Sequence, residues 1–178
     1  MEASALTLLF LDVDGTLIPF GAPRPYPVFE APFGAPPAEA VAHPLLDRVD
    51  PALGPRLAGL GCDLVWATTW MEDANVCLSP WLGLPRLPLV DWPGEEDDGG
   101  GPAGLHWKTR PLVDWAGNRP FVWLDDEITD VDRAWTAAHH LAPALLHRVD
   151  HRHGLTDADF AAVAEWLRLR LSGAPAAP

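Results

Sequence analysis

A chain of 178 residues, 48% of them hydrophobic, is long enough to bury one core but short for two, so we expect a single domain. Its formal net charge of −13 at pH 7 argues against non-specific binding to nucleic acid or to an anionic membrane, because both require a basic surface. The two cysteines, Cys62 and Cys77, are too few for a disulfide framework, and without a signal segment or a membrane-spanning apolar run the sequence predicts a soluble cytoplasmic protein.

The first predicted element is a strand over residues 6–12, LTLLFLD, because a short continuous apolar run is typical of a strand that is covered on both faces. Residues 19–43 are rich in proline, which donates no backbone hydrogen bond, and predict an irregular flap region. Residues 43–60 carry leucines at helical spacing, but Pro51 and Pro55 predict an interrupted or two-piece helix.

The middle of the chain predicts two more strands and one helix. The run CDLVWATT predicts a strand over 62–69, and the residues after it predict a helix over 71–84 that ends at Pro80 and Gly83. RLPLVDW predicts a short strand over 86–92. Residues 93–104 are acidic and rich in glycine, so we expect a loop there.

The last third of the chain again alternates helices and strands. Pro111 in a first turn and Gly117 just past a last turn are typical of helix ends, and Thr156 is a good N-cap. In chain order, the elements are a helix over 106–117, a strand over 119–126, a helix over 129–140, a strand over 142–150 and a helix over 156–171. Residues 173–178, rich in proline and alanine, predict a flexible tail.

This alternation predicts an α/β fold, namely one three-layer, Rossmann-like domain over residues 1–172 with a mainly parallel sheet of five strands. Such a sheet binds its ligands beyond the carboxyl ends of its strands, so polar residues that end separate strands should meet in one site. Those residues are Asp12 and Asp14 after the first strand, Thr68 and Thr69 after the second, Asp125 and Asp126 at the end of the fourth, and Lys108 in the helix before it.

The order and spacing of these residues resemble the motifs of the haloacid dehalogenase (HAD) superfamily of aspartate-nucleophile phosphatases. LDVDGT matches the first motif, LVWAT the second, Lys108 the third and FVWLDD the fourth, over roughly residues 6–150. Lys108 is the only lysine among the 12 lysines and arginines, which favours a site that requires an ammonium group. The phrases WATTW and WLDDE resemble small bacterial members without an assigned substrate, among them modules of RNA-repair proteins.

The resemblance implies a phosphatase that forms an aspartyl-phosphate on Asp12. At an ordinary pKa of about 3.9, an aspartate is ionised at neutral pH and needs no base to become a nucleophile. A divalent cation cancels its repulsion with a phosphate dianion, and a site of a few carboxylates without cysteine or histidine ligands favours Mg²⁺. Asp126 is the expected second carboxylate ligand, Asp125 supports it or shares the role, and the resemblance adds the backbone carbonyl of Asp14.

The other side chains have expected roles around the transferred phosphoryl group. Asp14 is the general acid that protonates the leaving alkoxide and then the base that deprotonates water. Lys108 is expected to contact both the phosphoryl oxygens and Asp12, and the Thr68 hydroxyl is expected to donate to another phosphoryl oxygen. The expected substrate-binding residues are Gly15, which permits a tight phosphate cradle, Thr16, which buttresses it, and Thr69, the alternative to Thr68.

The first gap between the motifs, residues 16–41, is proline-rich and too short for the usual helical cap of the superfamily, and the second, residues 70–107, holds only a predicted helix, a short strand and the acidic loop, which predicts a minimal cap or none. The resemblance then implies an open site for a phosphorylated substrate, either a small molecule or the end of a macromolecule such as a protein or a nucleic acid. The net charge of −13 predicts no strong intrinsic binding of nucleic acid.

Several alternatives stay open beside the phosphatase. A DxDG segment is often only a turn, although a calcium loop is excluded because the later oxygen ligands are missing after Gly15. A binding or regulatory module would keep the fold without useful turnover, and a phosphotransferase would use an acceptor other than water. Trp70 follows the strand that ends at Thr68 and is a candidate to flank the site.

Overall fold

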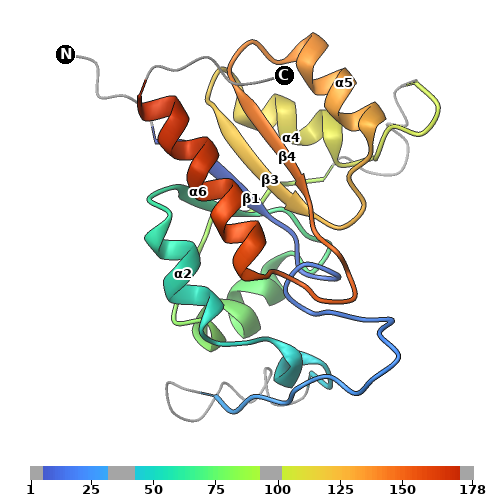
Figure 1. Ribbon diagram of the computed structural model, residues 1–178, viewed down its shortest axis with the longest axis vertical. Coiled ribbons are helices and arrows are strands. Elements are labelled where there is room, and N and C mark those ends of the chain that lie inside the picture. Colours follow the sequence, from blue (N-terminus) through green and yellow to red (C-terminus); the bar gives the residue numbers. More distant parts are fainter. Residues whose placement is uncertain (1–5, 32–42, 93–101, 173–178) are drawn as a thin grey trace.

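Four parallel strands form the sheet, in the order β2-β1-β3-β4 (Figure 1). The computed structural model describes residues 6–31, 43–92 and 102–172. The strands are β1 (Leu8–Leu11), β2 (Asp63–Trp66), β3 (Phe121–Asp125) and β4 (Ala144–Arg148). They confirm the predicted parallel α/β architecture and four of its five strands, each with slightly narrower bounds.

The helices lie where the sequence predicts them, with some irregular pieces. They are α2 (Leu53–Gly59), α3 (Ser79–Trp81), α4 (Thr109–Ala116), α5 (Asp130–His139) and α6 (Asp157–Leu171), with a 3-10 turn η1 (Leu46–Arg48) and a π-helical segment η2 (Ala74–Leu78). The predicted two-piece helix over 43–60 is confirmed as η1 and α2. Gly117, with a φ of 59°, ends α4 as predicted.

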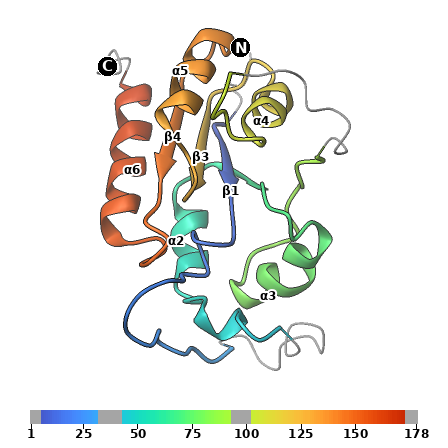
Figure 2. The same ribbon diagram turned by 90° about the vertical axis from the view of Figure 1, so that its right-hand side faces the viewer.

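Helices cover both faces of the sheet, which is why its strands read as continuous apolar runs. In β1, Leu9 and Leu11 pack in the core that contains residues of α2 and α6, whereas Leu8 and Phe10 pack in the core that contains residues of α4. Figures 1 and 2 show α6 on one side of the sheet and α4 with α5 on the other. With both faces closed, a ligand reaches this sheet at an edge formed by strand ends.

The prediction of a strand over residues 86–92 is wrong, because the structure has no regular strand there. Only an isolated parallel bridge between Trp66 and Leu89 remains, with the Trp66 amide donating to Pro88 and the Val90 amide donating to Trp66, both at 2.9 Å. Two features prevent a regular strand here. Pro88 has no amide to donate, and the Asn75 side chain forms hydrogen bonds with both the amide and the carbonyl of Leu87, at 2.8 and 2.9 Å. The described residues therefore form a sheet of four strands.

Parts of the predicted loops lie outside the described residues, namely 32–42 of the flap region, 93–101 of the acidic loop and the tail 173–178. Within the described parts, residues 19–31 and 102–108 contain no helix or strand. No helix among the described residues has the length and apolar character needed to cross a membrane.

Candidate active site

The carboxyl ends of β2, β1 and β3 lie side by side, which brings together the residues that follow them. The Asp12 amide donates to the Leu124 carbonyl at 3.1 Å, and the Ala67 amide donates to the Leu11 carbonyl at 2.9 Å. The backbone pairing thus continues beyond β1 toward both neighbouring strands. Polar residues from three separated segments of the chain therefore reach one edge of the sheet.

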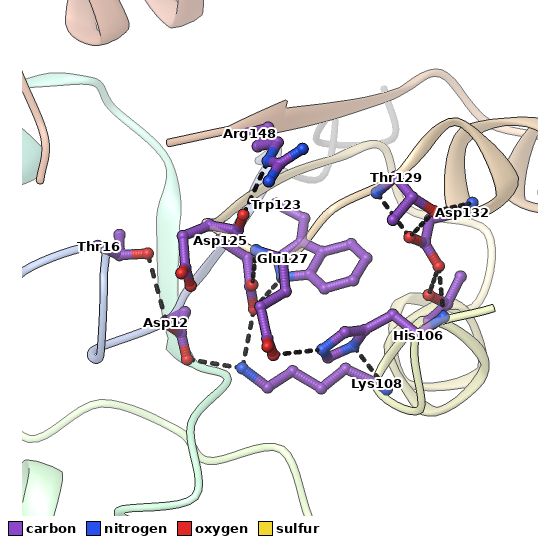
Figure 3. Close-up of polar contacts among 12 residues, drawn as sticks. Asp12, Thr16, His106, Lys108, Trp123, Asp125, Glu127, Thr129, Asp132 and Arg148 are labelled. Atoms are coloured by element: carbon purple, nitrogen blue, oxygen red, sulfur yellow. Dashed lines mark hydrogen bonds and ion pairs between the residues drawn. The ribbon is translucent and has the colours of Figure 1, made fainter. Parts of the chain in front are cut away.

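Lys108, which immediately precedes α4, connects Asp12 with the acidic pair at the end of β3. Its ammonium Nζ donates to Asp12 Oδ1 at 2.6 Å and to Asp125 Oδ2 at 2.8 Å (Figure 3). All three side chains are buried. The structure therefore places the predicted nucleophile, the predicted ammonium and one predicted acid in direct contact.

Asp125 is held on both of its carboxylate oxygens. Besides Lys108, its Oδ2 accepts a hydrogen bond from the indole Nε1 of Trp123 at 3.3 Å, and its Oδ1 accepts one from the Glu127 amide at 2.9 Å (Figure 3). A carboxylate with this many donors is a fixed anchor for Lys108. Its oxygens are less free to bind a further ligand than those of Asp126.

The carboxylate of Asp126 lies against the turn at Gly15. A Cβ on Gly15 would be 2.7 Å and 2.5 Å from Oδ1 and Oδ2 of Asp126, and Gly15 has a φ of 79°. Only glycine tolerates both conditions without strain. The Asp126 side chain makes no ion pair with any described residue, although Arg148 Nε donates to its backbone carbonyl at 2.9 Å. Asp126 is therefore a carboxylate available to a cation.

The cluster contains three carboxylates, those of Asp12, Asp125 and Asp126, and one ammonium group, that of Lys108. Burial acts to lower the pKa of Lys108, but Asp12 and Asp125 hold that pKa above its ordinary value, so the lysine is charged. Burial raises the pKa of Asp12 to about 8 against the effect of Lys108, and burial with Asp125 and Glu127 raises the pKa of Asp126. The sequence expectation that Asp12 has an ordinary pKa is therefore wrong for the protein alone.

These residues fit a magnesium ion. Asp12, Asp125 and Asp126 each offer a carboxylate oxygen, and the three oxygens lie within 4.8 Å of one another. All are hard oxygen ligands, which Mg²⁺ prefers, and a cation there would favour the ionised form of Asp12 that burial opposes. Because Gly15 has no Cβ, the Asp126 carboxylate has room to lie within reach of the other two.

Asp14 follows Asp12 by two positions and is exposed to solvent. The indole Nε1 of Trp70 donates to Asp14 Oδ2 at 3.0 Å, a contact between residues 56 positions apart. The ring of Trp70 packs on His43, with centroids 4.1 Å apart. The sequence marks Trp70 only as a residue that flanks the site, and the structure shows that it orients the predicted general acid.

The predicted threonines take up different positions. Thr68 is buried, and its Oγ1 accepts a hydrogen bond from the Trp70 amide at 3.2 Å, so the hydroxyl hydrogen remains to donate elsewhere. Thr69 is exposed. Thr16 is buried and its hydroxyl lies 3.4 Å from Asp12 Oδ2, to which it donates (Figure 3). Thr16 thus contacts the predicted nucleophile directly.

His106 and Glu127 were missed by the sequence analysis. His106 Nδ1 accepts a hydrogen bond from the Lys108 amide at 3.1 Å, and its Nε2 pairs with Glu127 Oε2 at 3.0 Å (Figure 3). These two bonds fix the start of the segment that carries the ammonium. The spacing His-x-Lys is the available sequence signal, and alone it is weak.

Asp132 is a third supporting residue that was not predicted from the sequence. It is buried in the first turn of α5, where its Oδ2 accepts from both the amide and the hydroxyl of Thr129 at 2.7 Å. Its Oδ1 accepts from the His106 amide at 2.8 Å and from the Thr109 hydroxyl at 2.7 Å (Figure 3). The capping pattern at 129–132 is visible in the sequence, but the bonds to the segment around Lys108 are not.

One comparison with known proteins gave a match. The family model described as "HAD domain in Swiss Army Knife RNA repair proteins" matches residues 8–160 of the chain. The matched range contains every residue of the cluster described above. A search of curated proteins and a search of solved structures gave no match.

Proposed function

Because the chain belongs to the family of HAD domains in Swiss Army Knife RNA repair proteins, we propose that it is a magnesium-dependent phosphatase that hydrolyses a phosphate monoester through an aspartyl-phosphate on Asp12. The family suggests phosphoryl-transfer or hydrolase-like chemistry in general. The observation that carries the finer proposal is the buried contact of 2.6 Å between Lys108 and Asp12, beside the Asp126 carboxylate, which forms no ion pair within the described part of the chain.

In the first step, a carboxylate oxygen of Asp12 attacks phosphorus as the bond from phosphorus to the ester oxygen breaks. Lys108 and the Thr68 hydroxyl donate to the phosphoryl oxygens, where negative charge accumulates. Asp14, oriented by Trp70 at 3.0 Å, gives its proton to the leaving alkoxide. The products of this step are the free alcohol and the aspartyl-phosphate.

In the second step, the ionised Asp14 takes a proton from water, which then attacks phosphorus and breaks the bond to Asp12. Inorganic phosphate leaves, and both aspartates return to their starting states. Asp14 is exposed, so water can reach it, whereas Asp12 is buried. Proton transfer and nucleophilic attack are thus assigned to two carboxylates with different surroundings.

Asp12, Asp126 and the backbone carbonyl of Asp14 would hold Mg²⁺, with Asp125 anchoring Lys108 beside them. When bound, the ion neutralises the repulsion between the carboxylate and the phosphate dianion. The raised pKa of Asp12, about 8 in the protein alone, supports the need for such a cation.

For the substrate, we favour a phosphate at an RNA end over a small metabolite, because the family description concerns RNA repair. A binding module without turnover has no physical need for a proton donor at Asp14 or for the buried ammonium of Lys108. A phosphotransferase would share the first step and differ only in the acceptor.

The test is a phosphatase assay with para-nitrophenyl phosphate and with RNA oligonucleotides that carry a 3′- or a 5′-phosphate, each with and without Mg²⁺. We expect release of phosphate that requires Mg²⁺ and falls at least a thousandfold in Asp12→Asn, the loss that follows removal of a nucleophile. Asp130→Asn, a change at an aspartate whose side chain is 99% exposed, is the matched control and should keep full activity. Turnover that survives Asp12→Asn would refute the mechanism, and release of a phosphorylated acceptor in place of phosphate would identify the phosphotransferase.

A further inference from the structure

Two tryptophans flank the residues that are proposed to hold the phosphoryl group. Trp107 and Trp92 pack edge to face, with ring centroids 4.9 Å apart and an interplanar angle of 73°. The indole Nε1 of Trp92 donates to the backbone carbonyl of Thr68 at 3.0 Å. Trp107 directly precedes Lys108 in the chain. The pair therefore bridges the strand end that carries Thr68 and the segment that carries Lys108.

Trp107 exposes a large aromatic surface next to Lys108 and the proposed nucleophile Asp12. The residue is 50% exposed, and its ring centroid lies 5.7 Å from Nζ of Lys108, the atom that contacts Asp12. An exposed indole gains nothing from the core, and its exposure to water is unfavourable. Its place beside the ammonium makes it accessible to whatever group is attached to the phosphate.

The side chain of Trp107 is also fixed in place. The His106 ring stacks on it, with centroids 5.6 Å apart and an interplanar angle of 29°, and His106 is itself held by Glu127 and by the Lys108 amide. Trp92 supports the ring from its edge. A preorganised aromatic surface binds a flat partner without a further loss of side-chain entropy.

We propose that Trp107, supported by His106 and Trp92, stacks on the nucleobase of the nucleotide that carries the scissile phosphate. This assignment rests on the proposed phosphatase function and specifies its substrate class. A nucleotide separates its base from its phosphate by one sugar, which suits an indole whose ring centroid lies 5.7 Å from the ammonium of Lys108.

Charge favours stacking as the source of affinity. Proteins that hold nucleic acid through its backbone use clusters of lysine and arginine, whereas this chain has 12 lysines and arginines against 25 aspartates and glutamates, a formal net charge of −13. Its one lysine is occupied by Asp12 and Asp125. Stacking on an aromatic side chain does not depend on the charge of the protein and tolerates any base. The stacked base supplies the affinity that the phosphate backbone does not.

The experiment compares binding of adenosine 5′-monophosphate, adenosine 3′-monophosphate and ribose 5-phosphate by calorimetric titration. The protein is the Asp12→Asn variant in a buffer with Mg²⁺, which prevents turnover during the titration. Ribose 5-phosphate carries the same phosphate ester as adenosine 5′-monophosphate without the base. We expect at least one adenosine monophosphate to bind about tenfold more tightly than ribose 5-phosphate, the contribution of one stacked base.

Adding Trp107→Ala should abolish that tenfold difference while leaving the affinity for ribose 5-phosphate unchanged, and Trp107→Phe should restore part of it. Trp115→Ala is the matched control, because Trp115 is also a partly exposed tryptophan but packs on Phe10 in the core, and it should keep the whole difference. If the base adds no affinity, if neither nucleotide binds, or if Trp107→Ala keeps the difference, the stacking assignment is wrong. Failure of the proposed function has a different signature, because the protein with Asp12 intact would then release no phosphate while base-dependent binding persisted.

Discussion

Gly15→Ala tests the arrangement of Asp12 and Asp126 with the smallest possible change. The added methyl group would meet the two Asp126 carboxylate oxygens at 2.7 Å and 2.5 Å, where ordinary contact begins at 3.4 Å. The Asp126 carboxylate must therefore move by about 1 Å, because the Gly15 amide donates a hydrogen bond to the Ile18 carbonyl at 2.9 Å, which fixes the backbone there.

Two separate losses follow from this change. Placing alanine at a φ of 79° costs about 1 to 2 kcal/mol in the free energy of unfolding. A displacement of about 1 Å in a group that organises the reaction lowers the rate about a hundredfold. We also expect a higher concentration of Mg²⁺ for half-maximal activity, because the displaced carboxylate is a proposed ligand of the ion.

Gly61→Ala separates these losses. Gly61 has a φ of 69°, but an added Cβ would have no atom within 4 Å, so this variant carries the backbone strain without the collision. Urea unfolding should show a similar loss of stability in both variants, whereas the phosphatase rate and its dependence on Mg²⁺ should change only in Gly15→Ala. If the two variants have equal activity, the carboxylate of Asp126 is not needed where the structure holds it, and the proposed metal site is wrong.

Two further predictions concern residues that support the site. Trp70→Phe removes the indole donor to Asp14 but keeps a ring against His43, so we expect kcat to fall about tenfold with little change in KM, and an unchanged kcat would show that Asp14 needs no orientation. Asp132→Asn should lower the free energy of unfolding at pH 7 by about 2 kcal/mol, measured in urea. Burial acts to raise the pKa of Asp132, but hydrogen bonds from Thr109, Thr129 and His106 outweigh it and hold that pKa below its ordinary 3.8. That stabilisation is present above about pH 4 and is lost as the pH falls through the lower pKa of the folded state, so the variant and the natural protein should converge in stability at acid pH. A difference that persists there would contradict the assignment, and Asp130→Asn, at an exposed aspartate, is the control.

The strands and the strand-end residues were predictable because burial on both faces leaves a direct mark on the sequence. A strand such as β1, whose side chains pack alternately on two helical layers, must be apolar throughout, and its first polar residue then marks its carboxyl end. Because the strands pair in parallel, their carboxyl ends lie at one edge of the sheet, and the residues that follow them come together there. The contact of Lys108 with Asp12 follows from these rules together with the family resemblance, whereas its contact with Asp125 was not predicted.

The predictions that were wrong or missing have one physical cause: they depend on contacts between residues that are distant in the sequence, which no local pattern encodes. The apolar run at 86–92 has the composition of a strand, but the side chain of Asn75, 12 residues away from Leu87, binds the backbone that a neighbouring strand would need. The pKa of Asp12 depends on how deeply the protein buries it, which the sequence around it does not state. Asp132 looks like an ordinary capping residue until the fold brings the segment around Lys108 to its second oxygen.

The alternation of side chains explains why two adjacent aspartates end β3 with different partners. Phe10 and Trp123 face the core that contains residues of α4, and Asp12 and Asp125 follow each of them by two positions, so both carboxylates point toward the side where α4 begins. Lys108 immediately precedes α4 and therefore reaches both. Asp126 has the opposite parity, shared with Leu124 of the other core, and it turns instead toward Gly15. One aspartate of the pair thus fixes the ammonium while the other remains free for a cation, and a single acidic residue at this strand end could not do both.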